Sequence, residues 1–187
     1  MEDISLHLLD LVQNSIAAGA SLVKIFIRES PKEGRLWVSV RDNGRGMDEN
    51  EAAKAADPFY TTRITRKVGL GIPLFKASAE ATDGSFEIRS KKGEGTEIAA
   101  MFHTSHIDCL PLGKIEDSIA ALIFMNPEMD IEYIHECCSN RFKLDTREIK
   151  KVLGDVSISL PEVVDWIKEY VRNGLDELNG GVGNEIS

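Results

Sequence analysis

A carboxylate and two glycines stand together in the stretch "VRDNGRGMDEN", where Asp42 ends a β-type alternation and Gly44 and Gly46 follow. Glycines let a ligand approach the backbone, and a fixed carboxylate can accept a hydrogen bond from an amino group. A plain turn after a strand has the same composition and is the more frequent meaning of Asp-Asn-Gly. Asp42 is therefore a candidate binding residue, and the rest of the pattern must decide.

A second glycine pair suggests phosphate chemistry. Gly69 and Gly71 in "KVGLGIPL" open a predicted helix, and Lys67 lies just before them. Unpaired backbone N–H groups at a helix N-terminus favour a bound phosphate, and the lysine adds positive charge. Ordinary capping of the helix by glycine is the alternative.

A third polar pair interrupts an apolar helix. Asp10 and Asn14 lie four residues apart, within a helical pattern formed by Ile4, Leu8, Leu11, Val12 and Ile16. Residues at this spacing share one side of a helix, here the flank of the apolar stripe. A core-facing helix has no structural need for a carboxylate and a carboxamide there.

These residues need a scaffold to hold them, and the pattern predicts one. We expect helices at 2–18, about 48–56 and 72–82, with Gly19, Asp48 and Pro73 as their end signals. Alternating segments predict two hairpins, formed by 22–30 with 35–42 and by 84–90 with 95–102. The expected fold class is α+β: a two-layer sandwich of a mixed, mostly antiparallel sheet with helices on one face.

The order of these motifs resembles the GHKL ATPase family, which comprises gyrase-type ATPase domains, cytosolic heat-shock chaperones, histidine kinases and mismatch-repair ATPases. "DLVQNSIAAGAS" is similar to the family's asparagine box, and "RDNGRGM" to its first glycine box. "DPFYTTR" and "GLGIPLFKASAEATDGSFEIRSKKGEGTEIAAMF" resemble the catalytic domain of histidine kinases. The resemblance covers residues 4–103, and a P-loop motif is missing.

The resemblance implies ATP and Mg²⁺ as ligands. It implies that Asn14 helps to hold Mg²⁺ against the phosphates and that Asp10 orients or deprotonates the attacking water. It further implies that Lys67, Gly69 and Gly71 face the phosphates.

For the adenine end, the resemblance implies that Asp42 accepts a hydrogen bond from the amino group, while Gly44 and Gly46 give the base room. Thr96 in "GEGTEI" matches the threonine that helps to close the adenine site, and 57–68 would form a lid.

Two departures bear on catalysis. The family usually has glutamate where this chain has Asp10, which is one methylene shorter, so hydrolysis would be slow without a loss of binding. Histidine kinases often carry a lysine where this chain has Ala17. Since three residues precede the first helical pattern, we expect no self-contained histidine kinase. The expected function is Mg-ATP binding used for slow hydrolysis or for phosphorylation of a regulatory protein partner, with a non-catalytic nucleotide-sensing module as the alternative.

Charge and composition divide the chain. Residues 1–104 hold 14 Lys/Arg and 15 Asp/Glu, whereas 105–187 hold 8 and 16, which gives −1 and −8 of the net −9. We expect an ATP-binding domain at 1–104 and an acidic α/β appendage at 105–187. This charge disfavours nucleic acid, and no apolar run approaches the roughly 18 residues of a membrane span. We expect a cytoplasmic protein, and a homodimer stays open.

The C-terminal part predicts a helix at "KIEDSIAALIFM", a hairpin turning at Ser139–Asn140, and two amphipathic helices, the last with a long apolar stripe. A metal site is the less favoured interpretation of six residues: His103, His106, Cys109, His135, Cys137 and Cys138. Neighbouring strand residues point to opposite faces, so we expect Cys137 and Cys138 to lie apart.

Overall fold

The computed structural model describes residues 3–59 and 70–180 and contains one six-stranded sheet in the order β3-β4-β2-β1-β5-β6. All neighbouring strands are antiparallel except β1 and β5, which run parallel. The strands are β1 (Leu22–Ser30), β2 (Arg35–Asp42), β3 (Ser85–Lys91), β4 (Gly95–His103), β5 (Asp130–Cys137) and β6 (Asn140–Asp145). The expected mixed, mostly antiparallel sheet is confirmed.

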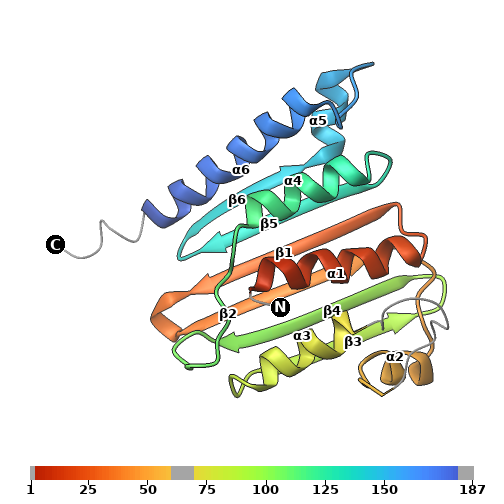
Figure 1. Cartoon of the computed structure of the whole chain (residues 1–187), viewed down its shortest axis with the longest axis vertical. Helices are drawn as coiled ribbons and strands as arrows, with labels where there is room; N and C mark the ends of the chain where they lie inside the picture. Colours follow the sequence, from red (N-terminus) through yellow and green to blue (C-terminus); the bar gives the residue numbers. More distant parts are fainter. Residues whose placement is uncertain (1–2, 60–69, 181–187) are drawn as a thin grey trace.

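Helices cover one face of this sheet, as expected, with α1 lying between α3 and α4 (Figure 1). The long helix α6 lies beside the β6 edge and packs mainly on α4 and β6. The helices are α1 (Ile4–Ala17), the 3₁₀ turn η1 (Pro31–Glu33), α2 (Glu49–Ala55), α3 (Gly71–Glu80), α4 (Ile115–Met125), α5 (Thr146–Leu153) and α6 (Pro161–Gly180).

Local signals explain where the helices begin and end. The side chain of Asp3 caps α1 by accepting from the Leu6 N–H, and Gly19 follows the helix with a φ of +74°. Asp48 and Glu51 form a reciprocal capping box at α2. These ends lie within two residues of the predicted ones, which leaves Asp10 and Asn14 on a complete helix.

The C-terminal segment extends the same sheet. β5 pairs with β1 from Leu22 with Asp130 to Glu29 with Cys137, and the buried core runs without a break from α1 to α6. Residues 104–114 connect β4 to α4, and this connection accepts two hydrogen bonds from the start of α1. The division into domains at 1–104 and 105–187 stays a prediction, since a shared sheet does not show whether either part folds alone.

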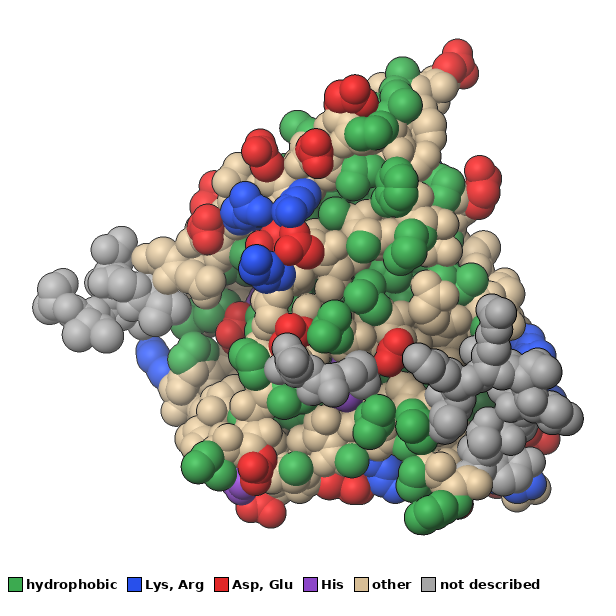
Figure 2. All heavy atoms as spheres, viewed as in Figure 1, with side chains coloured by type: hydrophobic (Ala, Val, Ile, Leu, Met, Phe, Trp, Pro, Cys, Tyr) green, Lys and Arg blue, Asp and Glu red, His purple; other side chains and the backbone are tan. Residues whose placement is uncertain are grey.

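Charged side chains gather where α6 lies on α4. Figure 2 shows Asp and Glu along α6, with a group of Lys and Arg beside some of them. Lys168 contacts Asp117 at 2.6 Å, and Arg172 contacts Glu116 at 3.7 Å. The apolar stripe of α6 packs against its own chain, because Ile167, Val171 and Leu178 are buried. No helix within the described ranges is long and apolar enough to cross a membrane.

The β5–β6 turn differs from the prediction. Cys137 pairs with Asn140, so the turn residues are Cys138 and Ser139 and not Ser139 and Asn140. Cys138 has a φ of +57° and has left the strand. The rule that neighbouring residues face opposite sides therefore does not apply, and the two cysteine sulfurs lie 3.8 Å apart. The expectation that these thiols lie apart was wrong.

Candidate functional site

Asp42 is held by three donors at the end of β2. Its Oδ1 accepts from the backbone N–H of Gly44 at 2.8 Å and of Thr96 at 3.3 Å, and its Oδ2 accepts from the Ser15 hydroxyl at 2.8 Å. The register of β2 and β4 places Asp42 opposite Thr96, and α1, which packs on the sheet, places Ser15 next to the same carboxylate. Asp42 is 9% exposed, and these bonds compensate for the hydration that its carboxyl group loses.

The three donors do not saturate this carboxylate. An ionised carboxylate offers about four acceptor positions, so the three donors found among the described residues leave roughly one for a ligand. Asp42 lies in the wall of a cavity of about 450 Å³, between α1, α2 and the ends of β2 and β4. The cavity combines apolar and polar walls, formed by Leu11, Asn14, Ser15, Ala17, Ala18, Val40, Asp42, Arg45, Gly46, Met47, Asp48, Asn50, Glu51, Lys54, Ala55, Ile72, Thr96 and Ile98.

Two of the predicted glycines allow close backbone packing near this cavity. A Cβ on Gly46, whose φ is +64°, would lie 1.9 Å from the carbonyl oxygen of Lys91. A Cβ on Gly44 would lie 2.9 Å from the carbonyl oxygen of Ala18. Gly46 also lines the cavity, whereas Gly44 contributes the N–H that holds Asp42. Both positions therefore exclude a larger residue, and Gly44 acts through the carboxylate.

Asn14 and Asp10 lie next to the first turn of α3. Asn14 is half-buried and lines the cavity, and its carboxamide has no hydrogen-bond partner among the described residues. A Cβ on Gly71 would lie 2.9 Å from the Asp10 Cβ and 3.7 Å from the Asn14 Nδ2. Gly71 thus brings the N-terminus of α3 against both polar side chains. Asp10 lies outside the cavity wall and remains accessible to solvent, while partial loss of hydration against its neighbours raises the pKa of its carboxyl group.

Not every predicted residue can be located. Lys67, Gly69 and most of the predicted lid at 57–68 lie outside the described residues. Of the remaining positions, Asn14, Asp42, Gly46 and Thr96 share the cavity wall, while Asp10, Gly44 and Gly71 support or border it.

Sequence reasoning missed Ser15. This serine is 3% exposed, and its hydroxyl lies 2.8 Å from Asp42 and 3.4 Å from the Leu11 carbonyl oxygen. It was detectable as a small hydroxyl residue next to Asn14, but its partner is 27 residues away. Ser90 was also missed; its hydroxyl lies 2.8 Å from the Thr96 hydroxyl and accepts from the Met47 N–H.

The outer rim of the cavity is charged. Lys92 contacts Asp48 at 2.9 Å and Glu51 at 3.5 Å. The backbone N–H of Glu51, followed by the Lys92 ammonium group, lowers the pKa of the Asp48 carboxyl. The Asp48 carboxyl is therefore ionised at neutral pH and lies at the exposed edge of the cavity.

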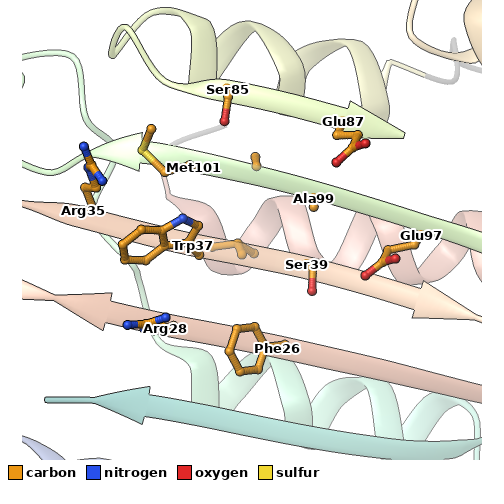
Figure 3. A pocket seen from close by; sticks show the side chains of 12 residues that line it. Phe26, Arg28, Arg35, Trp37, Ser39, Ser85, Glu87, Glu97, Ala99 and Met101 are labelled. Carbon is orange, nitrogen blue, oxygen red and sulfur yellow. The ribbon is translucent and has the colours of Figure 1, made fainter. Parts of the chain in front are cut away.

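A second hollow, of about 460 Å³, lies on the sheet face away from the helices (Figure 3). Trp37 and Phe26 form part of it, and the Arg28 guanidinium stacks 5.1 Å from the Trp37 ring centroid. None of the predicted site residues that the structure describes lines this hollow. The convergence of buried polar groups therefore distinguishes the cavity at Asp42.

The six histidines and cysteines do not converge on a metal site in the part of the chain that the structure describes. No group of three or more His, Cys, Asp or Glu side chains there has the arrangement of a metal centre. His135 instead bridges two side chains, with its Nδ1 2.7 Å from the Tyr133 hydroxyl and its Nε2 2.7 Å from Glu29.

Known proteins resemble this chain in sequence. The chain is 33% identical over 110 residues to the non-motile and phage-resistance protein of Caulobacter vibrioides; the aligned region covers 54% of this chain and 13% of that protein. It is 36% identical over 109 residues to the sensor protein kinase FleS of Pseudomonas aeruginosa; here the aligned region covers 58% of this chain and 26% of that protein. The chain thus matches at most about a quarter of either relative.

A solved structure agrees with the fold. The N-terminal domain of a DNA repair protein superposes with a TM-score of 0.54 at 14% identity, over 83% of this chain and 58% of that one. The family model described as histidine kinase-, DNA gyrase B-, and HSP90-like ATPase matches residues 2–106. This match covers more than half of the sequence and includes every predicted site residue, so the chain belongs to the histidine kinase-, DNA gyrase B- and HSP90-like ATPase family.

Proposed function

We propose that this chain binds ATP with Mg²⁺ in the cavity that Asp42 lines. The observation that carries the proposal is a buried carboxylate whose donors leave roughly one acceptor position, which suits the amino group of adenine. Apolar walls from Val40, Ile72 and Ile98 suit the flat faces of the base. Gly44, Gly46 and Thr96 would shape this end of the site.

The opposite end of the cavity suits the phosphates. The Asn14 carboxamide lines the cavity without a hydrogen-bond partner in the described part of the chain, and such an oxygen can coordinate Mg²⁺ together with phosphate oxygens and water. When bound, Mg²⁺ would neutralise charge on the phosphate groups. The first turn of α3 packs at Gly71 against Asn14, and the unpaired N–H groups of a helix N-terminus favour a phosphate. We include Lys67 and Gly69 in the phosphate end by the family resemblance.

Asp10 supports a use of the bound ATP that goes beyond binding. Its carboxylate lies beside Gly71 and Asn14 but outside the cavity wall, where it could orient water or a partner's hydroxyl. We propose slow hydrolysis or phosphorylation of a regulatory protein partner in the cytoplasm. Exposed apolar side chains at Val152 and Trp166 support contact with another protein, and a homodimer would use the same kind of surface.

The alternative is a non-catalytic module that senses a nucleotide. The short Asp10 side chain favours it, because an aspartate carboxylate reaches less far toward a water than a glutamate carboxylate does. Release of labelled phosphate under single-turnover conditions separates the two functions. Release above that of the Asp10→Asn variant supports an enzyme, whereas stable nucleotide and no labelled acceptor protein support the sensor.

Asp42→Asn tests the binding proposal. The substitution replaces an acceptor-only group with an amide, so ATP binding should weaken by about 1–3 kcal/mol. GTP, which presents an oxygen in place of the amino group, should bind poorly to the unmodified chain. Titration calorimetry with both nucleotides measures these effects.

Asp83→Asn is a matched control for this experiment. It removes the same charge at an exposed turn with a φ of +56°, a conformation that asparagine tolerates. It should leave ATP binding unchanged. Equal affinities for ATP and GTP in the unmodified chain would remove Asp42 from the proposed role.

A further inference from the structure

Two thiols meet at the β5–β6 turn, away from the proposed nucleotide site. Cys137 is the last residue of β5 and is 2% exposed, while Cys138 is an exposed turn residue. Their sulfurs lie 3.8 Å apart, and the backbone of Cys138 is left-handed, with a φ of +57°. Both thiols are free, so the turn holds a vicinal dithiol.

This dithiol lies at the far end of β1 from Asp42. Val23, near the start of β1, pairs with Asp42, whereas Glu29, near its end, pairs with Cys137. Six residues of strand separate these positions by about 20 Å. The dithiol is therefore a site separate from the cavity, and the proposal below does not rest on what the cavity binds.

The two sulfurs differ in their surroundings. Burial raises the pKa of the Cys137 thiol to about 11, and the Cys138 thiol and the Glu29 carboxylate add to this effect. Cys137 therefore stays protonated near neutral pH. Cys138 faces solvent, so a reagent in solution reaches Cys138 first and meets Cys137 only through it.

We propose that Cys137 and Cys138 form an oxidative modification site, at which a hydroperoxide converts the adjacent thiols to one intramolecular disulfide. In the first step, the Cys138 thiolate attacks a peroxide oxygen, an S–O bond forms, the O–O bond breaks, and an alcohol or water leaves. In the second step, the Cys137 sulfur attacks the sulfenic sulfur, the S–S bond forms, the S–O bond breaks, and water carries away the remaining proton. The peroxide is reduced by the two electrons that the thiols lose.

The geometry favours the second step over competing reactions. A disulfide needs the sulfurs at about 2.0 Å, so they must approach from their present 3.8 Å separation. Cys138 and Ser139 are exposed turn residues, so the side chain of Cys138 can rotate without disturbing the core. Because the partner thiol is the adjacent residue, it meets the sulfenic acid before a thiol from solution does. Adjacent Cα atoms are about 3.8 Å apart, below the roughly 4.4–6.8 Å of most disulfides, so the bond should be strained and readily reduced.

The test uses the whole chain with Cys109 replaced by serine. Cys109 is half-buried in the 104–114 connection, and its removal leaves Cys137 and Cys138 as the two thiols of the chain. The protein is treated with hydrogen peroxide, unfolded, alkylated and mapped by mass spectrometry. We expect loss of both alkylation sites, a disulfide linking residues 137 and 138, and recovery of both sites after reduction.

Two variants make the result specific. In Cys138→Ser, the buried Cys137 should stay alkylatable at the same peroxide dose. In Cys137→Ser, Cys138 should stop at the sulfenic acid, which dimedone traps. An intermolecular disulfide, a stable sulfenic acid at Cys138 with Cys137 still reduced, or two unmodified thiols would each overturn the proposal. Phenylarsine oxide gives a second readout, because its arsenic binds two neighbouring thiols. We expect a 1:1 adduct on the reduced chain and no adduct on Cys138→Ser.

Discussion

The proposed nucleotide site depends on Asp42, whose carboxylate accepts hydrogen bonds from residues of three segments. Ser15 reaches it from α1, Gly44 from the loop after β2, and Thr96 from β4. A carboxylate fixed in this way keeps one orientation before any ligand arrives. Preorganisation of this kind lowers the ordering cost of binding.

Ser15→Ala tests that preorganisation. The substitution removes one donor to Asp42 without touching the acceptor position that faces the cavity, so ATP affinity should fall by about 0.5–1.5 kcal/mol. The loss should be smaller than that caused by Asp42→Asn. Ser118→Ala is the matched control, because Ser118 is a buried helical serine that donates to a backbone carbonyl of α1. Equal losses in calorimetric titrations of the two serine variants would show a general packing effect.

Asp10→Asn separates catalysis from binding. Because Asp10 lies outside the cavity wall, nucleotide affinity should be nearly unchanged, while turnover should fall by about 10²–10⁴-fold. Burial raises the pKa of Asp10, and a base works in its ionised form. The rate should therefore drop as pH falls through this raised pKa, and the Asn variant should lack this limb. A single-turnover pH series on both proteins measures it; identical profiles would exclude Asp10 as the base.

At the scale of elements, most of the site's support was predictable from sequence. The strand end at Asp42, the capping box at Asp48 and Glu51, and the first turn of α3 at Gly71 each follow from local periodicity or local end signals. Contacts between segments that are distant in the sequence leave no comparable local pattern. The Ser15 bond to Asp42 and the β5–β6 turn at Cys138 depend on how elements meet, so sequence reasoning missed the first and misplaced the second.

Helix α1 also contains a pH-sensitive contact. His7 is 1% exposed, its ring centroid lies 5.5 Å from that of Phe75 with the ring planes tilted by 54°, and its Nε2 lies 3.1 Å from the Ser78 hydroxyl. Its Nδ1 has no partner among the described residues. Burial lowers the pKa of His7 from 6.5 to about 4, because an imidazolium would be desolvated there.

Folding should consequently weaken in mild acid. In the unfolded chain His7 binds a proton near pH 6.5, whereas in the folded chain it binds one only near pH 4. The contribution of neutral His7 to the free energy of unfolding is therefore complete above pH 6.5. It is lost as the pH falls from 6.5 toward 4. Between pH 7.5 and 5, His7 should remove about 2 kcal/mol of unfolding free energy. Urea unfolding of the unmodified chain and of His7→Gln measures the difference. A variant with the same pH dependence as the parent would refute this role.

At the scale of the whole molecule, the two predicted segments share one sheet. The sequence predicted a strand at β5, but not its parallel pairing with β1, since the two strands are separated by three helices and three strands along the chain. That pairing covers an edge of β1 that would otherwise be exposed. Tyr133 and Ile131 of β5 are fully buried in the same core as Ile25 and Ile27 of β1.

This shared core predicts that the chain unfolds as one unit, and its two tryptophans allow a direct test. Trp37 lies on β2 and Trp166 on α6, so Trp166→Phe leaves a reporter in the first segment and Trp37→Phe leaves one in the second. Ile131 is 0% exposed on β5, and Ile131→Ala should cost about 2–5 kcal/mol through the lost apolar contact and the cavity left behind.

If the sheet transmits that loss, the urea midpoint reported by Trp37 should fall by about 1–2 M together with that reported by Trp166. Leu160→Ala, at a 44% exposed site before α6, is the control and should shift neither midpoint appreciably. A Trp37 midpoint unchanged by Ile131→Ala would instead mean that the nucleotide-binding part folds independently of β5. The parallel pairing with β1 would then be a docking contact between two domains and not a joint on which the stability of the site depends.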